Sequence, residues 1–139
     1  MKTYIKANQE AAKRFFTSEA SRPVTMLNLL RFRKTADYSK HPELAPDHDI
    51  SGQEAYQKYI QSALPLLLKV GSRLIYSGNT AEFLIGPSEE KWDLVLLVEH
   101  PNRAIFMSFA TDEEYLKIEG HRTAALEDSR LLPIEVQQL

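Results

Sequence analysis

The stretch over residues 92–100, WDLVLLVEH, constrains the fold of this chain more than any other. Successive side chains of a β-strand point to opposite faces, so a strand formed here would carry leucine or valine on both faces. Such a strand belongs in the middle of a sheet that is covered on each side. A chain of 139 residues has helices to spare for one face only, which leaves a second copy of the protein as a candidate cover for the other.

A second strand with the same signature is predicted over residues 24–32, VTMLNLLRF, and the two strands are expected to lie side by side at the centre of the sheet. Residues 72–77 predict another strand, which continues over residues 81–85 after a bulge or bend at Gly78-Asn79. This segment is expected to form a hairpin with residues 92–100.

The first long helix is predicted to start at a capping box made by Ser51 and Glu54, each of which satisfies a free backbone N–H of the other. An apolar stripe then faces the sheet, and Pro65 is expected to kink or interrupt the helix. The last strand is predicted over residues 130–136. Proline has no backbone N–H, so Pro133 places this strand at an edge of the sheet.

The second helical region is predicted in pieces. Asn102 caps the first piece, and a second capping box, Thr111-Asp112-Glu113-Glu114, starts another. Gly120 is expected to break the pattern, so that residues 121–127 form a separate helical segment.

The order strand, helix, strand, strand, helix, strand is that of the ferredoxin-like split βαβ fold, an α+β architecture with a four-stranded antiparallel sheet and both helices on one face. A contiguous apolar sheet face usually marks an interface, so a homodimer through that face, a dimeric α/β barrel, is expected. A helix over residues 8–16 looks peripheral. The expected organisation is therefore an N-terminal helical extension, residues 1–22, and a ferredoxin-like domain, residues 23–139.

Composition excludes several classes of function. The chain has 17 basic and 19 acidic residues spread along its length. This distribution produces no positive electrostatic field that would favour binding to nucleic acid or to an anionic membrane. It has no cysteine, which excludes disulfides, thiolate metal sites and a cysteine nucleophile. The N-terminus lacks the unbroken apolar core of a signal peptide, and no stretch approaches membrane-spanning length, so a cytoplasmic location is expected.

Several short motifs, in a fixed order, resemble the family known as domain of unknown function 1330. They are MLNLLRF, EAYQKY, LLKVGSRLIYSG after Pro65, LIGP, WDLVLLVEHP, DEEY and HRTAALEDSRLLP, and together they extend over residues 24–136. One departure is Ser72, where a second glycine often follows Gly71. The resemblance implies a dimeric α/β barrel, related in fold to small cofactor-free monooxygenases and muconolactone isomerase-like proteins. It implies no activity, and the N-terminal helix and the loop over residues 34–50 look like additions to the typical domain.

His121, Asn28 and Tyr59 are the candidate catalytic residues. A histidine can exchange a proton near neutral pH. The alternative is that His121 and Arg122 form a structural basic pair at a helix end. Asn28 places an amide inside an apolar central strand, where it needs a hydrogen-bond partner such as a ligand, water or backbone. Tyr59 could present its phenol to a pocket, but a tyrosine at helical spacing is more often part of the core.

Five further residues are candidates for substrate binding. An arginine can hold a carboxylate or a developing oxyanion through two parallel hydrogen bonds. Ordinary salt bridges account for most arginines near the rim of a sheet, and Tyr56 and Trp92 have the alternative of being core residues. The set is Arg31, Tyr56, Arg73, Trp92 and Arg122.

The loop over residues 34–50 is the candidate lid, because it is long, has two prolines and lacks a periodic pattern. It contains residue types that bind zinc, iron or manganese, namely His41, Glu43, Asp47, His48 and Asp49. Their spacing does not place two ligands on one helical face, so no metal site is predicted, and no cofactor is expected.

Two hypotheses for function follow. The first is a cofactor-independent enzyme that oxygenates or isomerises a small, partly apolar organic molecule in a cleft between the sheet and the helices. The second is a non-catalytic homodimer that binds a small ligand or has a structural role. Analogy with the fold favours the enzyme, but a fold alone does not establish an activity.

Overall fold

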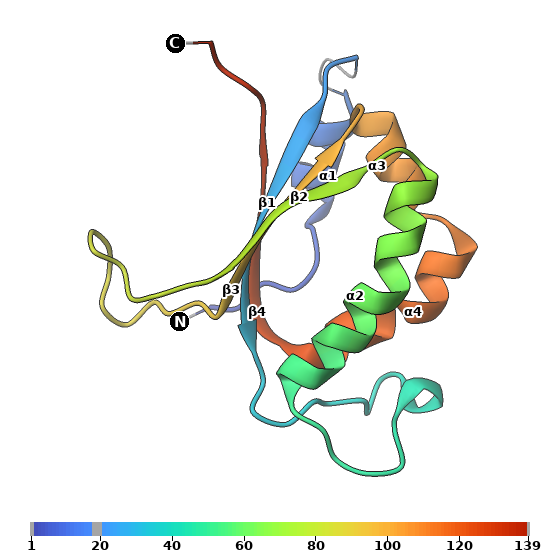
Figure 1. Ribbon diagram of the computed structural model, residues 1–139, viewed down its shortest axis with the longest axis vertical. Helices are drawn as coiled ribbons and strands as arrows, with labels where there is room; N and C mark the ends of the chain where they lie inside the picture. Colours follow the sequence, from blue (N-terminus) through green and yellow to red (C-terminus); the bar gives the residue numbers. More distant parts are fainter. Residues whose placement is uncertain (1, 18–20, 139) are drawn as a thin grey trace.

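The computed structural model describes residues 2–17 and 21–138. In chain order its elements are α1 (Gln9–Thr17), β1 (Val24–Phe32), the 3-10 turn η1 (Pro42–Leu44), α2 (Gly52–Lys69), β2 (Arg73–Asn79), β3 (Leu94–His100), α3 (Arg103–Ala110), α4 (Glu113–Ala125) and β4 (Leu126–Ile134). Figure 1 shows one sheet with the helices gathered on one side of it.

The four strands form an antiparallel sheet in the order β2-β3-β1-β4. The two doubly apolar strands, β1 and β3, are the central pair, as predicted, and β4 with Pro133 lies at an edge. With the helices on a single face, this is the ferredoxin-like fold that the sequence predicted. No helix within residues 2–17 and 21–138 is long and apolar enough to cross a membrane.

The two faces of the sheet differ in how they are covered. On the helix side, Met26 and Leu30 of β1 and Leu96 of β3 are buried in the core with α2 and α4. On the other face, which we call the open face, Leu97 is only half-buried, and Leu132 is 55% exposed. The open face is therefore apolar and uncovered within one chain.

Helix α2 begins as predicted, because the Ser51 hydroxyl accepts from the Glu54 N–H and the Glu54 carboxylate accepts from the Ser51 N–H. The expected interruption at Pro65 is wrong, since α2 continues to Lys69. Pro65 and Gln61 are both exposed, so water can bond the Gln61 carbonyl that has lost its N–H partner.

Gly120 does not break the second helical region, which corrects the prediction. Helix α4 runs through it to Ala125 and continues directly into β4. A Cβ at Gly120 would lie 2.6 Å from Cγ of His41 and 2.7 Å from Cδ1 of Leu44. The glycine therefore lets the loop over residues 34–50 pack closely on α4. The cap of α4 is Asp112, one residue later than the predicted box would begin.

The hairpin of β2 and β3 is present, but its details differ from the prediction. The register shift lies between Leu74 and Tyr76, and residues 81–85 form no strand. Leu84 and Ile85 are instead 99% and 93% exposed in the loop that joins the two strands. Figure 1 shows this loop extending away from the body of the sheet.

Candidate functional site

A cavity of about 840 Å³ lies between the helix side of the sheet and the helices, and we call it the main cavity. Its lining includes Met26 and Asn28 of β1, Leu96, Val98 and His100 of β3, Tyr56, Tyr59, Ala63 and Leu67 of α2, Phe106 and Phe109 of α3, and Tyr115, Glu119 and Arg122 of α4. Most of these side chains are apolar or aromatic. The few polar groups therefore determine what the main cavity can hold.

Three phenols form the polar part of the helix wall. The hydroxyls of Tyr59 and Tyr115 lie 3.0 Å apart, and the rings of Tyr56 and Tyr59 are 5.2 Å apart. Burial raises the pKa of all three phenols, and the charge of Arg122 opposes this effect only in part. The three hydroxyls are therefore protonated at neutral pH. Either Tyr59 or Tyr115 donates its O–H to the other, which leaves the O–H of the second residue and that of Tyr56 available as hydrogen-bond donors.

Asn28 faces these phenols from the middle of the sheet. Its amide nitrogen donates to the Met26 carbonyl at 3.2 Å, and its oxygen has no hydrogen-bond partner among the residues that the structure describes. Because Asn28 lines the main cavity, that oxygen can accept a hydrogen bond from a bound molecule.

Helix α4 adds charge to the same wall. Arg122 and Glu119 are one turn apart, and both line the main cavity. The Arg122 Nη1 atom donates to the carbonyl of Ile5 at 2.9 Å, which fixes the guanidinium against the N-terminal segment. A cation and a carboxylate are thus available at the edge of the phenol cluster.

His121 lies between Glu119 and Arg122 in sequence, but its side chain contacts Tyr38 and does not line the main cavity. Its Nδ1 atom lies 2.7 Å from the hydroxyl of Tyr38, a buried residue of the loop over residues 34–50. Burial, assisted by the charge of Lys58, lowers the pKa of His121. The structure brings Asn28 and Tyr59 together in one cavity and leaves His121 outside it.

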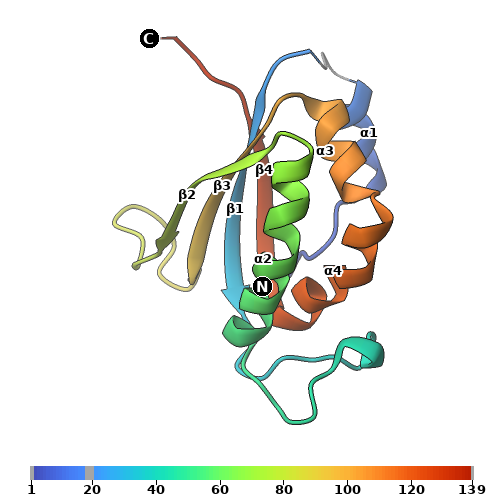
Figure 2. The same ribbon diagram turned by 45° about the vertical axis from the view of Figure 1, so that its right-hand side comes forward.

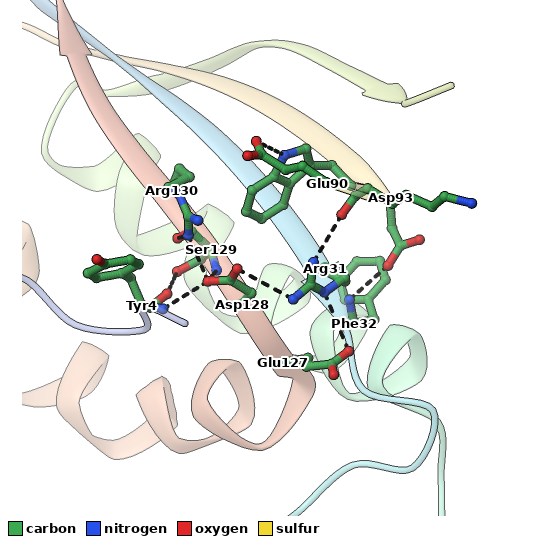
Figure 3. Close-up of polar contacts among 11 residues, drawn as sticks. Tyr4, Arg31, Phe32, Glu90, Asp93, Glu127, Asp128, Ser129 and Arg130 are labelled. Carbon is green, nitrogen blue, oxygen red and sulfur yellow. Dashed lines mark hydrogen bonds and ion pairs between the residues drawn. The ribbon is translucent and has the colours of Figure 1, made fainter. Parts of the chain in front are cut away.

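Arg31 and Trp92 also lie outside the main cavity. The carboxylate of Asp128 is completely buried and sits 3.4 Å from Arg31 Nη2 and 2.7 Å from Arg130 Nη1 (Figure 3). The guanidinium groups of Arg31 and Arg130 lie 5.7 and 5.0 Å from the ring of Trp92. These groups satisfy one another and form a structural cluster.

Asp128 also fixes the N-terminal segment to β4. Burial alone would raise its pKa, but hydrogen bonds from the Tyr4 backbone, the Arg130 side chain and the Ser129 backbone outweigh burial, so its pKa is lowered. The Ser129 hydroxyl in turn donates to the Tyr4 carbonyl at 2.6 Å. Figure 3 shows Tyr4 held beside β4 by these contacts.

The remaining candidates lie on the surface. Arg73 is exposed on β2 and pairs with Glu99 at 2.9 Å. In the loop over residues 34–50, His48 pairs with Asp47 at 2.6 Å, and His41 lies 3.5 Å from Glu43. Within residues 2–17 and 21–138, no three His, Cys, Asp or Glu side chains gather closely enough to hold a metal ion.

Besides Tyr115 and Glu119 of α4, two parts of the main cavity were missed from the sequence. The first is the N-terminal segment, which looked peripheral. Residues from Tyr4 to Phe16 form one wall, and the Phe15 ring packs edge-on against Phe106 at 5.6 Å, with α1 beside α3 (Figure 2). The loop over residues 34–50, expected as the lid, packs instead on α4 through Tyr38.

The second missed part is His100, which is 1% exposed and lines the main cavity at the end of β3. A signal for it was present in the sequence. His100 continues the series Leu94, Leu96 and Val98 on the helix-facing side of β3. Strand alternation therefore predicts that its ionisable ring lies in an apolar layer.

The chain is similar to a protein of unknown function from Rhodopseudomonas palustris, with a TM-score of 0.86 and 31% sequence identity over 99% of this chain and 100% of the other. The methylated form of that protein gives a TM-score of 0.89 and 32% identity over 99% and 98% of the two chains. A protein from Bacteroides fragilis, described as dimeric, of unknown function and ferredoxin-like, has a TM-score of 0.46 and 18% identity over 82% and 96%.

No curated protein matches the chain. The model of a protein family described as a domain of unknown function (DUF1330) matches residues 46–135, which is more than half of the sequence. The match begins after β1 and most of the loop over residues 34–50. The chain therefore belongs to the DUF1330 family, as its sequence motifs suggested.

Proposed function

We propose that the protein is a cofactor-independent enzyme that oxygenates or isomerises a small, partly apolar organic molecule bound in the main cavity. The observation that carries the proposal is the convergence of Asn28 from the sheet, Tyr59 from α2 and Arg122 from α4 on one cavity of about 840 Å³. Ligand sites are typically apolar cavities of roughly this size that contain a few polar groups.

The polar groups suit a substrate that passes through an enolate. Protonated phenols can donate to the substrate oxygen, and the positive charge of Arg122 stabilises the negative charge that develops there. Glu119 supplies a carboxylate that can accept the proton from the carbon next to the carbonyl. Returning that proton to another carbon isomerises the substrate, whereas reaction of the enolate with O₂ oxygenates it.

A screen of small phenols, enols and 1,3-diketones tests the proposal. Thermal shift identifies the compounds that bind, and absorbance change and O₂ consumption then report turnover. Ala63→Phe fills the main cavity from α2 and should abolish the thermal shifts. Gln61→Phe adds the same ring at an exposed position of α2 and should preserve them. Equal shifts in the two variants would place the compounds elsewhere.

Turnover separates the enzyme from a non-catalytic binding protein. Tyr59→Phe removes one hydroxyl without changing the ring and should lower kcat/KM by about 100-fold or more, the effect of losing one hydrogen bond to a developing oxyanion. His121→Gln should leave kcat/KM unchanged, because His121 bonds to Tyr38 outside the cavity. Compounds that bind in the main cavity and are never turned over would instead support the non-catalytic alternative.

We also propose that the protein is a homodimer in which a second copy covers the open face. Leu27 and Leu29 of β1 and Val95 and Leu97 of β3 form the middle of this face and are only half-buried in one chain. A contiguous apolar face of this kind usually marks an interface, and a two-fold axis through it would pair like residues.

A further inference from the structure

His100 lines the main cavity at the end of β3, near the start of α3, and two aromatic rings pack against it. Its ring is 4.9 Å from that of Phe106 and 6.2 Å from that of Phe109. Burial lowers the pKa of His100 to about 4, so the ring is neutral at neutral pH. A neutral imidazole has one donor nitrogen and one acceptor nitrogen.

Ser72 determines which nitrogen of His100 is the donor. The Ser72 side chain is almost completely buried, and its hydroxyl lies 2.7 Å from Nδ1 of His100. A buried hydroxyl that finds no acceptor costs about 1–3 kcal/mol, so Ser72 donates to Nδ1 and the ring proton is on Nε2. Nε2 has no hydrogen bond to any of the residues that the structure describes, which leaves its N–H available to a molecule in the main cavity.

The distance between the two polar ends follows from the strand register. Asn28 pairs with Leu96, and His100 is four residues further along β3. At about 3.3 Å per residue the backbones of Asn28 and His100 are separated by about 13 Å along the strand direction. The wall between them is apolar and includes Met26 and Val98.

We propose that the Nε2–H of His100 binds an oxygen at the far end of the ligand. The ligand class is then an elongated molecule with an oxygen at each end and an apolar middle, which extends from Asn28 and Tyr59 to His100. This inference rests on the proposed function only in that both use the main cavity.

Two rigid probes of comparable length test this subsite. Biphenyl-4-ol carries one hydroxyl, and biphenyl-4,4′-diol carries one at each end. Isothermal titration calorimetry should show that the diol binds about fivefold more tightly than the mono-ol, which is the effect of one net hydrogen bond. The Ser72→Ala/His100→Phe double variant replaces both partners of the Ser72–His100 hydrogen bond with apolar groups, so it should fold. It should bind the diol no more tightly than the mono-ol, because the far hydroxyl of the diol then has no partner.

The outcomes distinguish the subsite from the proposed function. Equal affinity of the two probes for the wild-type protein, or a diol preference that persists in the double variant, would overturn the role of His100 while leaving the main cavity as a binding site. Failure of both probes to bind the wild-type protein would contradict the main cavity as a ligand site and, with it, the proposed subsite at His100. Tyr59→Phe should weaken both probes equally and preserve their ratio.

Discussion

The burial of His100 makes the stability of the fold depend on pH. Its pKa falls from an ordinary value of 6.5 to about 4 in the folded chain. Each pKa unit corresponds to about 1.4 kcal/mol, so the full difference is worth about 3 kcal/mol. Between pH 6.5 and 4 the unfolded chain binds a proton at His100 and the folded chain does not. The free energy of unfolding should therefore decrease as the pH falls through this window.

Urea unfolding at pH 7.5, 6.5, 5.5 and 4.5 measures this effect. The wild-type protein should lose about 2.5 kcal/mol more between pH 7.5 and 4.5 than the Ser72→Ala/His100→Phe double variant. The pKa of His121 is also lowered, so His121 contributes a loss in the same direction to both proteins, and the comparison cancels it. Equal losses in the two proteins would refute the reasoning, because they would show that His100 is protonated equally in the folded and unfolded chains.

Three further outcomes are expected. Gly52→Ala should lower the free energy of unfolding by about 2 kcal/mol in urea titrations, because the added Cβ would lie 2.5 Å from the backbone oxygen of Ala125. Unchanged stability would show that the backbones at Gly52 and Ala125 can move apart. Asp128→Asn should lower the free energy of unfolding by about 1–3 kcal/mol and speed hydrogen exchange at the Tyr4 amide, because it weakens a charge-assisted hydrogen bond. Unaltered exchange would show that Asp128 does not fix the N-terminal segment. Leu97→Glu on the open face should convert a dimer to a monomer in size-exclusion light scattering, and a wild-type monomer would contradict the proposed homodimer.

The sheet could be predicted because its determinants are local. Residues 24–32 and 92–100 are apolar on both faces, which places them at the centre whatever surrounds them, and Pro133 restricts its strand to an edge. One failure came from a tertiary contact. The sequence pattern predicts a helix break at Gly120, but the glycine allows the close packing of a loop that is distant in sequence.

The site could be predicted only in part, for a related reason. Asn28 was identifiable as a polar group in a buried layer, and it does line the main cavity. His121 and Arg122 are adjacent in sequence but point in different directions from α4, and sequence spacing alone could not assign one to the cavity and the other to Tyr38. His100 was not identified as a candidate because the strand before it is apolar. Strand alternation nevertheless places it on the same face as Leu94, Leu96 and Val98.

The central claim is that the main cavity is a ligand site, and a crystal structure of the protein soaked with biphenyl-4-ol tests it most directly. The account predicts density for the probe between the sheet and α2, with its hydroxyl within hydrogen-bond distance of Asn28 or Tyr59. A cavity closed by its own side chains, with the probe absent or bound only at the outer surface, would contradict the account.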